Sequence, residues 1–302
     1  MDGIIPVYKE RGMTSTDCVF KCRKIFKMRR VGHSGTLDPN VDGVLPVCVG
    51  KATKVVNYLM DSGKIYIGEI TLGFSTTTED LDGEIVEKKS VNEPFTSAEI
   101  NDKMNELTGD LIQIPPMYSA IKVNGRRLYD YARAGDPVER PERNVHIEYF
   151  KQTNPTVFDL DSGYQKIYFE VGCGKGTYIR TLAVDLGRQL GVPAVMSDLS
   201  RLSSGGFTID QAVKISELAE AAENGKLESL LYPVDYALQK YFHVVLNEKQ
   251  WEIIKNGGFL FPDEVNGTAK QIVLMYQNKA RCIYRYNEEK ERYQPEQMID
   301  LT

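Results

Sequence analysis

Residues 166–190, KIYFEVGCGKGTYIRTLAVDLGRQL, constrain the fold more than any other stretch of this sequence. Residues 166–173 are rich in β-branched and aromatic side chains, which predicts a strand. The apolar residues of 177–190 recur at spacings of three and four, which predicts an amphipathic helix. A glycine turn at Gly174 and Gly176 joins the two. A strand that leads through a short turn into a helix indicates a fold in which helices pack on a sheet.

Other segments predict more elements of the same two kinds. A helix follows the candidate caps Thr14 and Ser15, a strand covers 64–74, and a short helix follows the candidate cap Ser97. Near the end of the chain, Asn247 caps a helix that ends at Gly257 and Gly258, and residues 271–286 predict a hairpin. We therefore expect an α+β fold, a mixed, mostly antiparallel sheet flanked by helices with the active cleft across its face, and a small C-terminal module.

Length and composition exclude several classes of protein. A chain of 302 residues with 42% hydrophobic and 26% charged residues is long enough for about two globular domains. No apolar run approaches the roughly 20 residues of a membrane span, and the N-terminus does not resemble a signal peptide, so a cytoplasmic location is expected. The five scattered cysteines predict buried free thiols rather than a disulfide framework or a zinc site.

Charge is distributed unevenly along the chain. The net charge is −5, but residues 9–30 hold eight basic and two acidic residues, a local charge of +6. A basic patch on an acidic body can still bind phosphates, because such contacts act over a Debye length of about 8–10 Å. A solvated helix face explains the charge pattern equally well, so at this point both interpretations stay open.

The glycine-rich segment 30–54, RVGHSGTLDPNVDGVLPVCVGKATK, concentrates polar side chains in a loop. It is not a phosphate-binding P-loop, because six residues lie between Gly43 and Gly50, where the motif has four, and Ala52 follows the lysine. Ser34 lacks the G-x-S-x-G context of a serine nucleophile, and three histidines in the whole chain give poor support for zinc. Asp38, followed by a proline, is compatible with a fixed carboxylate and also with an ordinary turn, which the residues alone favour.

The same segment resembles the signature of TruB-type tRNA pseudouridine synthases, G-H-x-G-T-L-D-P followed by G-x-L-P-V and G-x-A-T-K. Four further stretches resemble that family in the same order: YKERGMTS, KIYIGEITLGFSTTTEDLDGEI, IPPMYSAIKVNGRRLYDYARAG and GKGTYIRTLAVDLG. LSRLSSGGF, residues 199–207, fits the stretch that follows. The resemblance covers residues 4–210, and residues 240–302 resemble a PUA-like RNA-binding domain more loosely.

This resemblance implies the fold and the site. The fold is the pseudouridine-synthase fold, with a catalytic domain at 1–235 that contains a thumb-like, RNA-gripping insertion at 114–143, and a PUA-like domain at 240–302. The implied catalytic residues are Asp38, the carboxylate; Arg180, which pairs with it; and Tyr66, which stacks on the base. The implied substrate and RNA contacts are His33, Tyr178, Leu199, Lys9, Lys21, Lys24, Arg29, Arg30, Arg126 and Arg127.

The implied reaction isomerises uridine to pseudouridine in the T loop of tRNA, at position 55, after the base is flipped out. It requires no cofactor or metal, and Asp38 acts either as a nucleophile or by removing a ribose proton. The expected partner is the T-arm stem-loop of tRNA, with no obligate protein partner, no membrane, and a monomeric state. The alternatives are a guide-RNA-dependent synthase and a tRNA-folding chaperone with secondary or no catalysis.

Two positions depart from the family pattern. Glu10 stands where the family has a proline after Lys9, which weakens the expected rigidity of that turn. Thr77 stands where the T-D-T-x-D pattern has its first aspartate, which puts any substrate role of that carboxylate in doubt. Asp38, Tyr66, Tyr178 and Arg180 are all present, so activity is still expected.

Overall fold

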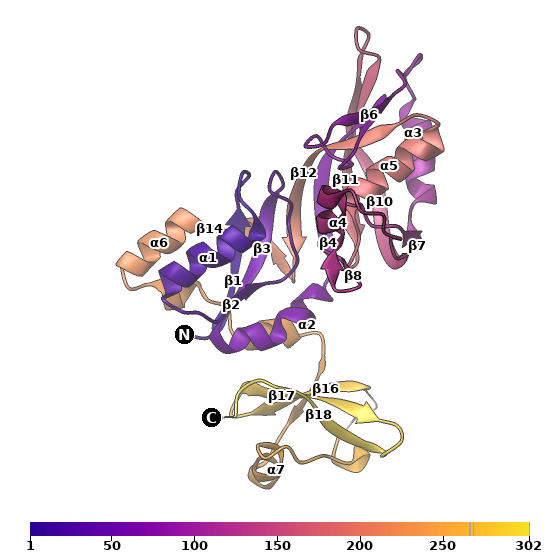
Figure 1. The fold of residues 1–302 in the computed structure, drawn as a ribbon. Coiled ribbons are helices and arrows are strands. Elements are labelled where there is room, and N and C mark those ends of the chain that lie inside the picture. The colour runs from indigo at the N-terminus through magenta and orange to yellow at the C-terminus, as the bar shows by residue number, and fades with distance from the viewer. Residues whose placement is uncertain (266, 268, 302) are drawn as a thin grey trace. The chain divides into compact units, whose positions relative to one another are not determined.

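The computed structural model describes residues 1–265, 267 and 269–301. The chain divides into two compact units: unit 1 comprises Met1–Asp61 and Ser204–Thr302, and unit 2 comprises Ser62–Ser203. Figure 1 shows the elements of both. None of the helices in the described residues has the length and apolar character needed to cross a membrane.

Unit 1 begins with a small sheet covered by helices. Strand β1 (Gly3–Lys9) pairs antiparallel with β3 (Asp42–Val49) and parallel with β14 (Val213–Lys214), and β2 (Val31–His33) pairs antiparallel with β3. Helices α1 (Ser15–Phe26) and α6 (Ile215–Glu223) bury apolar side chains against this sheet in one shared core. The remaining elements of this part are β13 (Phe207–Thr208), α2 (Val56–Met60) and the 3₁₀ helices η1 (Gly50–Val55), η2 (Ile209–Gln211), η3 (Leu227–Leu230) and η4 (Val234–Leu238).

The C-terminal part of unit 1 is a four-stranded sheet with one helix. Its strands are β15 (Phe242–Val245), β16 (Gln271–Tyr276), β17 (Lys279–Asn287) and β18 (Arg292–Met298), together with α7 (Glu248–Ile254) and η5 (Pro262–Glu264). The predicted hairpin is confirmed: Gln277 and Asn278 both adopt positive φ angles between β16 and β17, as a tight hairpin turn requires. Asn247 caps α7 as predicted.

Apolar side chains of this C-terminal sheet share one core with the N-terminal part of unit 1. Val273 and Ile283 lie in the same buried cluster as Ile4 and Val44. A salt bridge of 2.6 Å joins Lys51 to Asp300, close to the end of the chain. The boundary predicted between residues 235 and 240 stays a prediction about domain organisation.

Unit 2 is built on a mostly antiparallel sheet, in the order β12 (Ala194–Ser204), β4 (Lys64–Leu72), β11 (Tyr164–Cys173), β10 (Arg143–Asp159) and β7 (Gly109–Gln113). Helices α3 (Ser97–Glu106) and α5 (Ile179–Leu190) pack beside this sheet (Figure 1). Two small hairpins complete the unit, β5 (Phe74–Thr76) with β6 (Ile85–Lys88) and β8 (Lys122–Val123) with β9 (Arg126–Arg127), the second followed by α4 (Leu128–Ala134).

The predicted α+β class, with a mostly antiparallel sheet, flanking helices, an insertion and a C-terminal module, is confirmed. One predicted cap is wrong: Thr96, and not Ser97, caps α3, because the Thr96 hydroxyl accepts from the Glu99 backbone N–H while the Glu99 carboxylate accepts from Thr96. The five cysteines are buried free thiols, as predicted.

Candidate active site

Asp38 lies in unit 1, on the loop between β2 and β3, with its side chain half-buried. Its neighbours Leu37 and Val41 are both buried, each 4% exposed. The Val41 N–H donates to the Asp38 carbonyl at 3.1 Å, and the Leu37 N–H donates to the Ser15 hydroxyl at 2.9 Å. The carboxylate is therefore carried on a short turn between two buried anchors.

Lys9 lies beneath this loop and is fully buried. Its ammonium donates to the carbonyls of Glu10 at 3.1 Å, Met13 at 2.7 Å and Pro39 at 3.0 Å. The Gly12 N–H donates to the same Pro39 carbonyl at 3.0 Å. These bonds give Lys9 a structural role in holding the Asp38 loop, and its predicted contact with RNA stays a prediction.

His33 ends β2, opposite Val47 of β3, and is half-buried. Ser34, the next residue, is fully buried and donates its backbone N–H to the Pro46 carbonyl at 2.9 Å. A buried serine at this place agrees with the sequence argument against Ser34 as a nucleophile.

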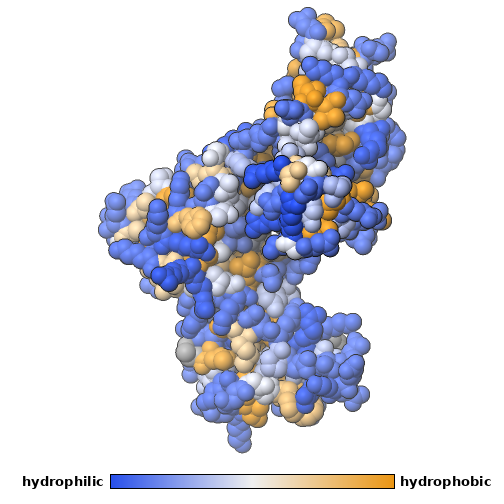
Figure 2. Space-filling model, in the orientation of Figure 1, coloured by the Kyte–Doolittle hydropathy of each residue, from blue (hydrophilic) through white to orange (hydrophobic). Residues whose placement is uncertain are grey.

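Apart from the buried Lys9, the basic residues of unit 1 that are predicted to contact RNA are all exposed, on α1 and on the turn that follows it: Lys21, Lys24, Arg29 and Arg30. Arg23, on the same helix, donates to the Val31 carbonyl at 3.2 Å and so ties the helix to β2. The surface over α1 and α6 is predominantly hydrophilic (Figure 2). The apolar side of α1 packs against the sheet whose strands β2 and β3 flank the Asp38 loop.

Arg180 lies in unit 2, in the first turn of α5, and is only 5% exposed. Its guanidinium donates to the Thr78 carbonyl at 2.9 Å and to the Tyr118 carbonyl at 3.0 Å, and its Nε lies 3.7 Å from an Asp80 carboxylate oxygen. A planar guanidinium can serve three such partners at once because its donors point in fixed directions. The predicted pairing of Arg180 with Asp38 stays a prediction.

The sequence analysis does not single out Asp80, although its carboxylate faces Arg180. The Thr78 hydroxyl and the Asp82 N–H both donate to an oxygen of Asp80, at 2.5 and 3.0 Å. Thr77, which replaces the family aspartate, is exposed and donates its backbone N–H to the Glu84 carbonyl. The signal that could have identified Asp80 is its place at the end of the TTTED run, three residues beyond that substitution.

Glu79 occupies the same turn with a φ of +65°. Its carboxylate accepts from the Thr181 hydroxyl at 3.1 Å, and burial raises the pKa of this carboxyl above its usual value. The Met196 N–H donates to its carbonyl at 3.1 Å. The turn is thereby fixed to both α5 and β12 of unit 2.

The predicted pocket-lining residues of unit 2 come from three elements. Tyr66 on β4 and Leu199 on β12 are each 6% exposed, and their strands are neighbours in the sheet. Tyr178 caps α5, and its backbone is bonded at both ends to the Gln113 side chain, at 3.0 and 3.2 Å. Gln113 is a positioning residue that the sequence did not reveal, because its partner lies 65 positions away.

The insertion 114–143 contains two contrasting arginines. The Arg126 guanidinium donates to Asp136 at 2.5 Å and to the Asp130 carbonyl at 2.6 Å, and it lies 4.4 Å from the centre of the Tyr131 ring. Arg127 is exposed and lies beside Tyr129. Both arginines are therefore bonded within the insertion, and Arg127 is the more exposed of the two.

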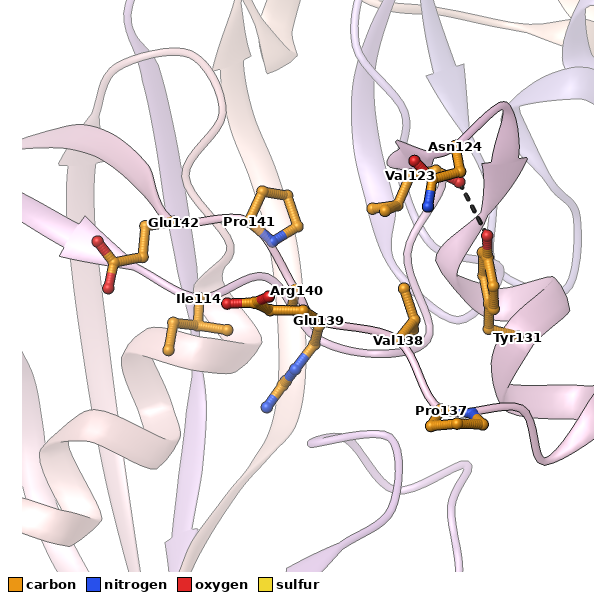
Figure 3. A pocket seen from close by; sticks show the side chains of 10 residues that line it. All are labelled: Ile114, Val123, Asn124, Tyr131, Pro137, Val138, Glu139, Arg140, Pro141 and Glu142. Carbon is orange, nitrogen blue, oxygen red and sulfur yellow. Dashed lines mark hydrogen bonds between the residues drawn. The ribbon is translucent and has the colours of Figure 1, made fainter.

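An open hollow of about 910 Å³ lies at the base of the insertion (Figure 3). Val123 and Tyr131 line it from one side and Ile114 and Glu142 from the other, and the Tyr131 hydroxyl donates to the Val123 carbonyl. None of the predicted site residues lines this hollow. Among the residues that the structure describes, no cluster of histidine, cysteine and acidic side chains could hold a metal ion.

The model of the TruB family pseudouridylate synthase N-terminal domain matches residues 23–179, and the model of the tRNA pseudouridylate synthase B C-terminal domain matches 180–239. The chain belongs to the TruB family. The first model spans Asp38 and Tyr66, and the second begins at Arg180. Membership makes the protein a pseudouridine synthase, an isomerase, as the sequence resemblance implied.

Similar TruB-family proteins match over the whole length of the chain. The "tRNA pseudouridine synthase B" of Ligilactobacillus salivarius is 63% identical over 302 residues, all of both chains. Its namesake in Pediococcus pentosaceus is 56% identical over 99% of each chain. Among solved structures, a Cbf5-Nop10-Gar1 complex contains a chain with a TM-score of 0.70 and 25% identity, covering 94% of this chain and 78% of that one.

Proposed function

We propose that this TruB-family isomerase converts uridine 55 in the T loop of tRNA to pseudouridine and that Asp38 is its catalytic carboxylate. The observation that carries the proposal is the Asp38 loop, in which a half-buried carboxylate is held between the buried anchors Leu37 and Val41. Full-length relatives that are named for tRNA support the substrate class.

The reaction breaks the N1–C1′ glycosidic bond, turns the base and joins C5 to C1′. A carboxylate assists either as the nucleophile or by removing a ribose proton, and both roles need it ionised and fixed in place. In this proposal Arg180 keeps Asp38 ionised and oriented. Tyr66 stacks on the flipped uracil, and Tyr178 and Leu199 line the pocket. The chemistry uses only side chains, without a cofactor.

Binding must offset the cost of extruding a base from a folded loop, which is a few kcal/mol. Stacking on Tyr66 contributes about 1–3 kcal/mol, and phosphate contacts contribute more. We assign those contacts to the basic residues of α1 and its following turn, with His33 beside the flipped base and Arg127 on the insertion. The protein in this proposal acts in the cytoplasm as a monomer without a protein partner.

The decisive experiment incubates the purified chain with unmodified tRNA transcript and maps pseudouridine. We expect conversion at position 55 by the natural chain and none by Asp38→Asn, which keeps the size of the side chain. Two further substrates serve as controls. A transcript with cytidine at position 55 lacks the target uridine, and an isolated T-arm stem-loop contains the target without the rest of the tRNA. Pseudouridine at another position, or full activity of Asp38→Asn, contradicts the proposal.

The same assay separates the two alternatives. If the enzyme depends on a guide RNA, the transcript stays unmodified until a guide RNA is added. If the protein is only a chaperone, the natural chain and Asp38→Asn accelerate tRNA folding to the same extent and neither forms pseudouridine. We expect pseudouridine to form without a guide RNA, because the proposed reaction needs only the protein and the tRNA.

A further inference from the structure

Tyr8, Arg11 and Asp42 form a polar cluster beside the Asp38 loop that nothing in the proposed chemistry uses. The Tyr8 hydroxyl donates to the Asp42 carboxylate at 2.9 Å, and Arg11 Nε lies 3.4 Å from the same oxygen. We propose that Asp42 is a positioning residue for Asp38, acting through Tyr8 and Arg11. The inference rests on the proposed catalytic role of Asp38.

The position of Asp42 in the fold allows it to influence where Asp38 lies. It is the first residue of β3 and closes the loop that carries Asp38. Tyr8 lies at the end of β1, where the Tyr8 backbone pairs with Val44 and the Lys9 backbone pairs with Gly43. The Tyr8–Asp42 bond therefore ties the closing end of the loop to a strand inside the sheet.

Arg11 ties the same end to the turn that follows β1. That turn already holds the middle of the loop, because the Gly12 N–H and the Lys9 ammonium both donate to the Pro39 carbonyl. The loop is thus bonded to the 9–13 segment at Pro39 and again at Asp42. Because both attachments lie just after Asp38 in the chain, the loop that carries Asp38 cannot move relative to β1 unless at least one of them breaks.

The chemistry of the cluster suits a fixed attachment. The hydrogen bond from the Tyr8 hydroxyl to Asp42, together with burial, raises the pKa of Tyr8. The hydroxyl therefore stays protonated and remains a donor at neutral pH. The Asp42 side chain is 17% exposed, whereas that of Arg11 is 46% exposed. Solvent screens the Arg11 charge more, so the Tyr8 bond should matter more than the ion pair.

Glu10 gives a reason for such attachments in this chain. Gly12 has a φ of +82°, and Glu10 stands where the family pattern has a proline. A proline fixes its own φ, whereas a glutamate leaves that angle to be set by contacts. Side-chain bonds from Tyr8 and Arg11 to Asp42 supply the restriction that the backbone itself lacks.

The test compares Asp42→Ala, Asp42→Asn, Tyr8→Phe and Arg11→Gln with Asp263→Asn, an exposed aspartate of the same unit, as the matched control. We expect Asp42→Ala to lower kcat about 10- to 100-fold, because displacement of a catalytic group by about 1 Å costs that order of rate. KM for tRNA should change less than about twofold. The amide oxygen of Asp42→Asn can still accept from Tyr8, so this variant should recover most of kcat.

Double variants test whether the residues act together. Tyr8→Phe combined with Asp42→Ala should be no slower than Asp42→Ala alone, because the two changes remove the same bond. A kcat for Asp42→Ala within twofold of the natural chain overturns the inference. So does a large rise in KM at unchanged kcat, since that is the signature of a direct contact with RNA.

The natural chain and Asp38→Asn are assayed in parallel to separate this inference from the proposed function. An inactive natural chain or an active Asp38→Asn overturns the proposed function. An active natural chain, an inactive Asp38→Asn and an unaffected Asp42→Ala overturn only the role of Asp42. Should Asp42→Ala fail to fold, Tyr8→Phe gives the same kcat comparison, because it removes the hydroxyl and keeps the ring.

Discussion

Two buried cations, Lys9 in unit 1 and Arg180 in unit 2, differ in how far apart along the chain their bonded partners lie. The Lys9 ammonium binds carbonyls one, four and 30 positions away, within the loop system around Asp38. Arg180 binds carbonyls 102 and 62 positions away and also faces the Asp80 carboxylate. Lys9 therefore stabilises a local loop, whereas Arg180 joins three distant segments of unit 2.

The largest effect is expected from Arg180→Met. It leaves the partly buried Asp80 carboxylate without its cation and the Thr78 and Tyr118 carbonyls without their donor, and removing one partner of a buried pair costs about 3–5 kcal/mol. We expect a loss of that order in the free energy of unfolding, measured by urea denaturation, and a loss of activity of more than about 100-fold. Arg180→Lys keeps the charge but not the planar fork, and it should recover stability more than activity.

Lys9→Met should cost less, about 2–4 kcal/mol, because it leaves carbonyls rather than a charge unsatisfied. The comparison becomes sharper with hydrogen exchange measured by mass spectrometry. Exchange in Lys9→Met should rise only around residues 9–15 and 37–43, whereas Arg180→Met should raise it around 76–82 and 114–120. If Lys9→Met also accelerates exchange in the insertion, the distinction between a local and a long-range support is wrong.

Glu79→Gln tests the electrostatics of the Arg180 side. Burial raises the pKa of Glu79 above 4.5, against the hydrogen bond from Thr181 and the charges of Arg180 and Arg140. Because the folded state holds this proton more tightly, the stability it contributes is complete below pH 4.5 and is lost as pH rises through the folded pKa.

The stability of Glu79→Gln relative to the natural chain should therefore increase between pH 4.5 and neutrality. Urea midpoints at both pH values give the measurement, and the exposed Glu87→Gln is the control for replacing a glutamate by glutamine. A constant difference between Glu79→Gln and the natural chain contradicts the raised pKa.

The smallest effects concern helix ends, where the two units should behave alike. Thr14 and Thr96 both form capping boxes, with Asp17 and Glu99. Replacing either threonine by alanine should cost about 1 kcal/mol, whereas Ser97→Ala should cost less than about 0.5 kcal/mol. The measurement is again the urea midpoint, and unequal costs for the two caps would show that the units differ in more than their buried cations.

Patterns that depend on neighbouring residues were predictable. The strand and helix of 166–190, the helix after Thr14 and the Gln277–Asn278 hairpin follow from spacing and turn chemistry, and all are present as β11 with α5, α1, and β16 with β17. Ser97 was mistaken for a cap because two adjacent hydroxyl residues offer the same local signal. Only the backbone geometry decides between them, and it selects Thr96.

The sequence by itself determined the fold class, the family and Asp38 as the candidate carboxylate, because these are encoded in local patterns and in one ordered set of motifs. Only the tertiary structure decided that Lys9 is a buried support, that Asp80 faces Arg180, and that Tyr8 and Arg11 meet at Asp42. The bonds that reach furthest in these contacts join residues 30 to 100 positions apart, from Lys9 with Pro39 to Asp80 with Arg180. Their partners are chosen by how strands and loops pack, and no periodicity along the chain records that choice.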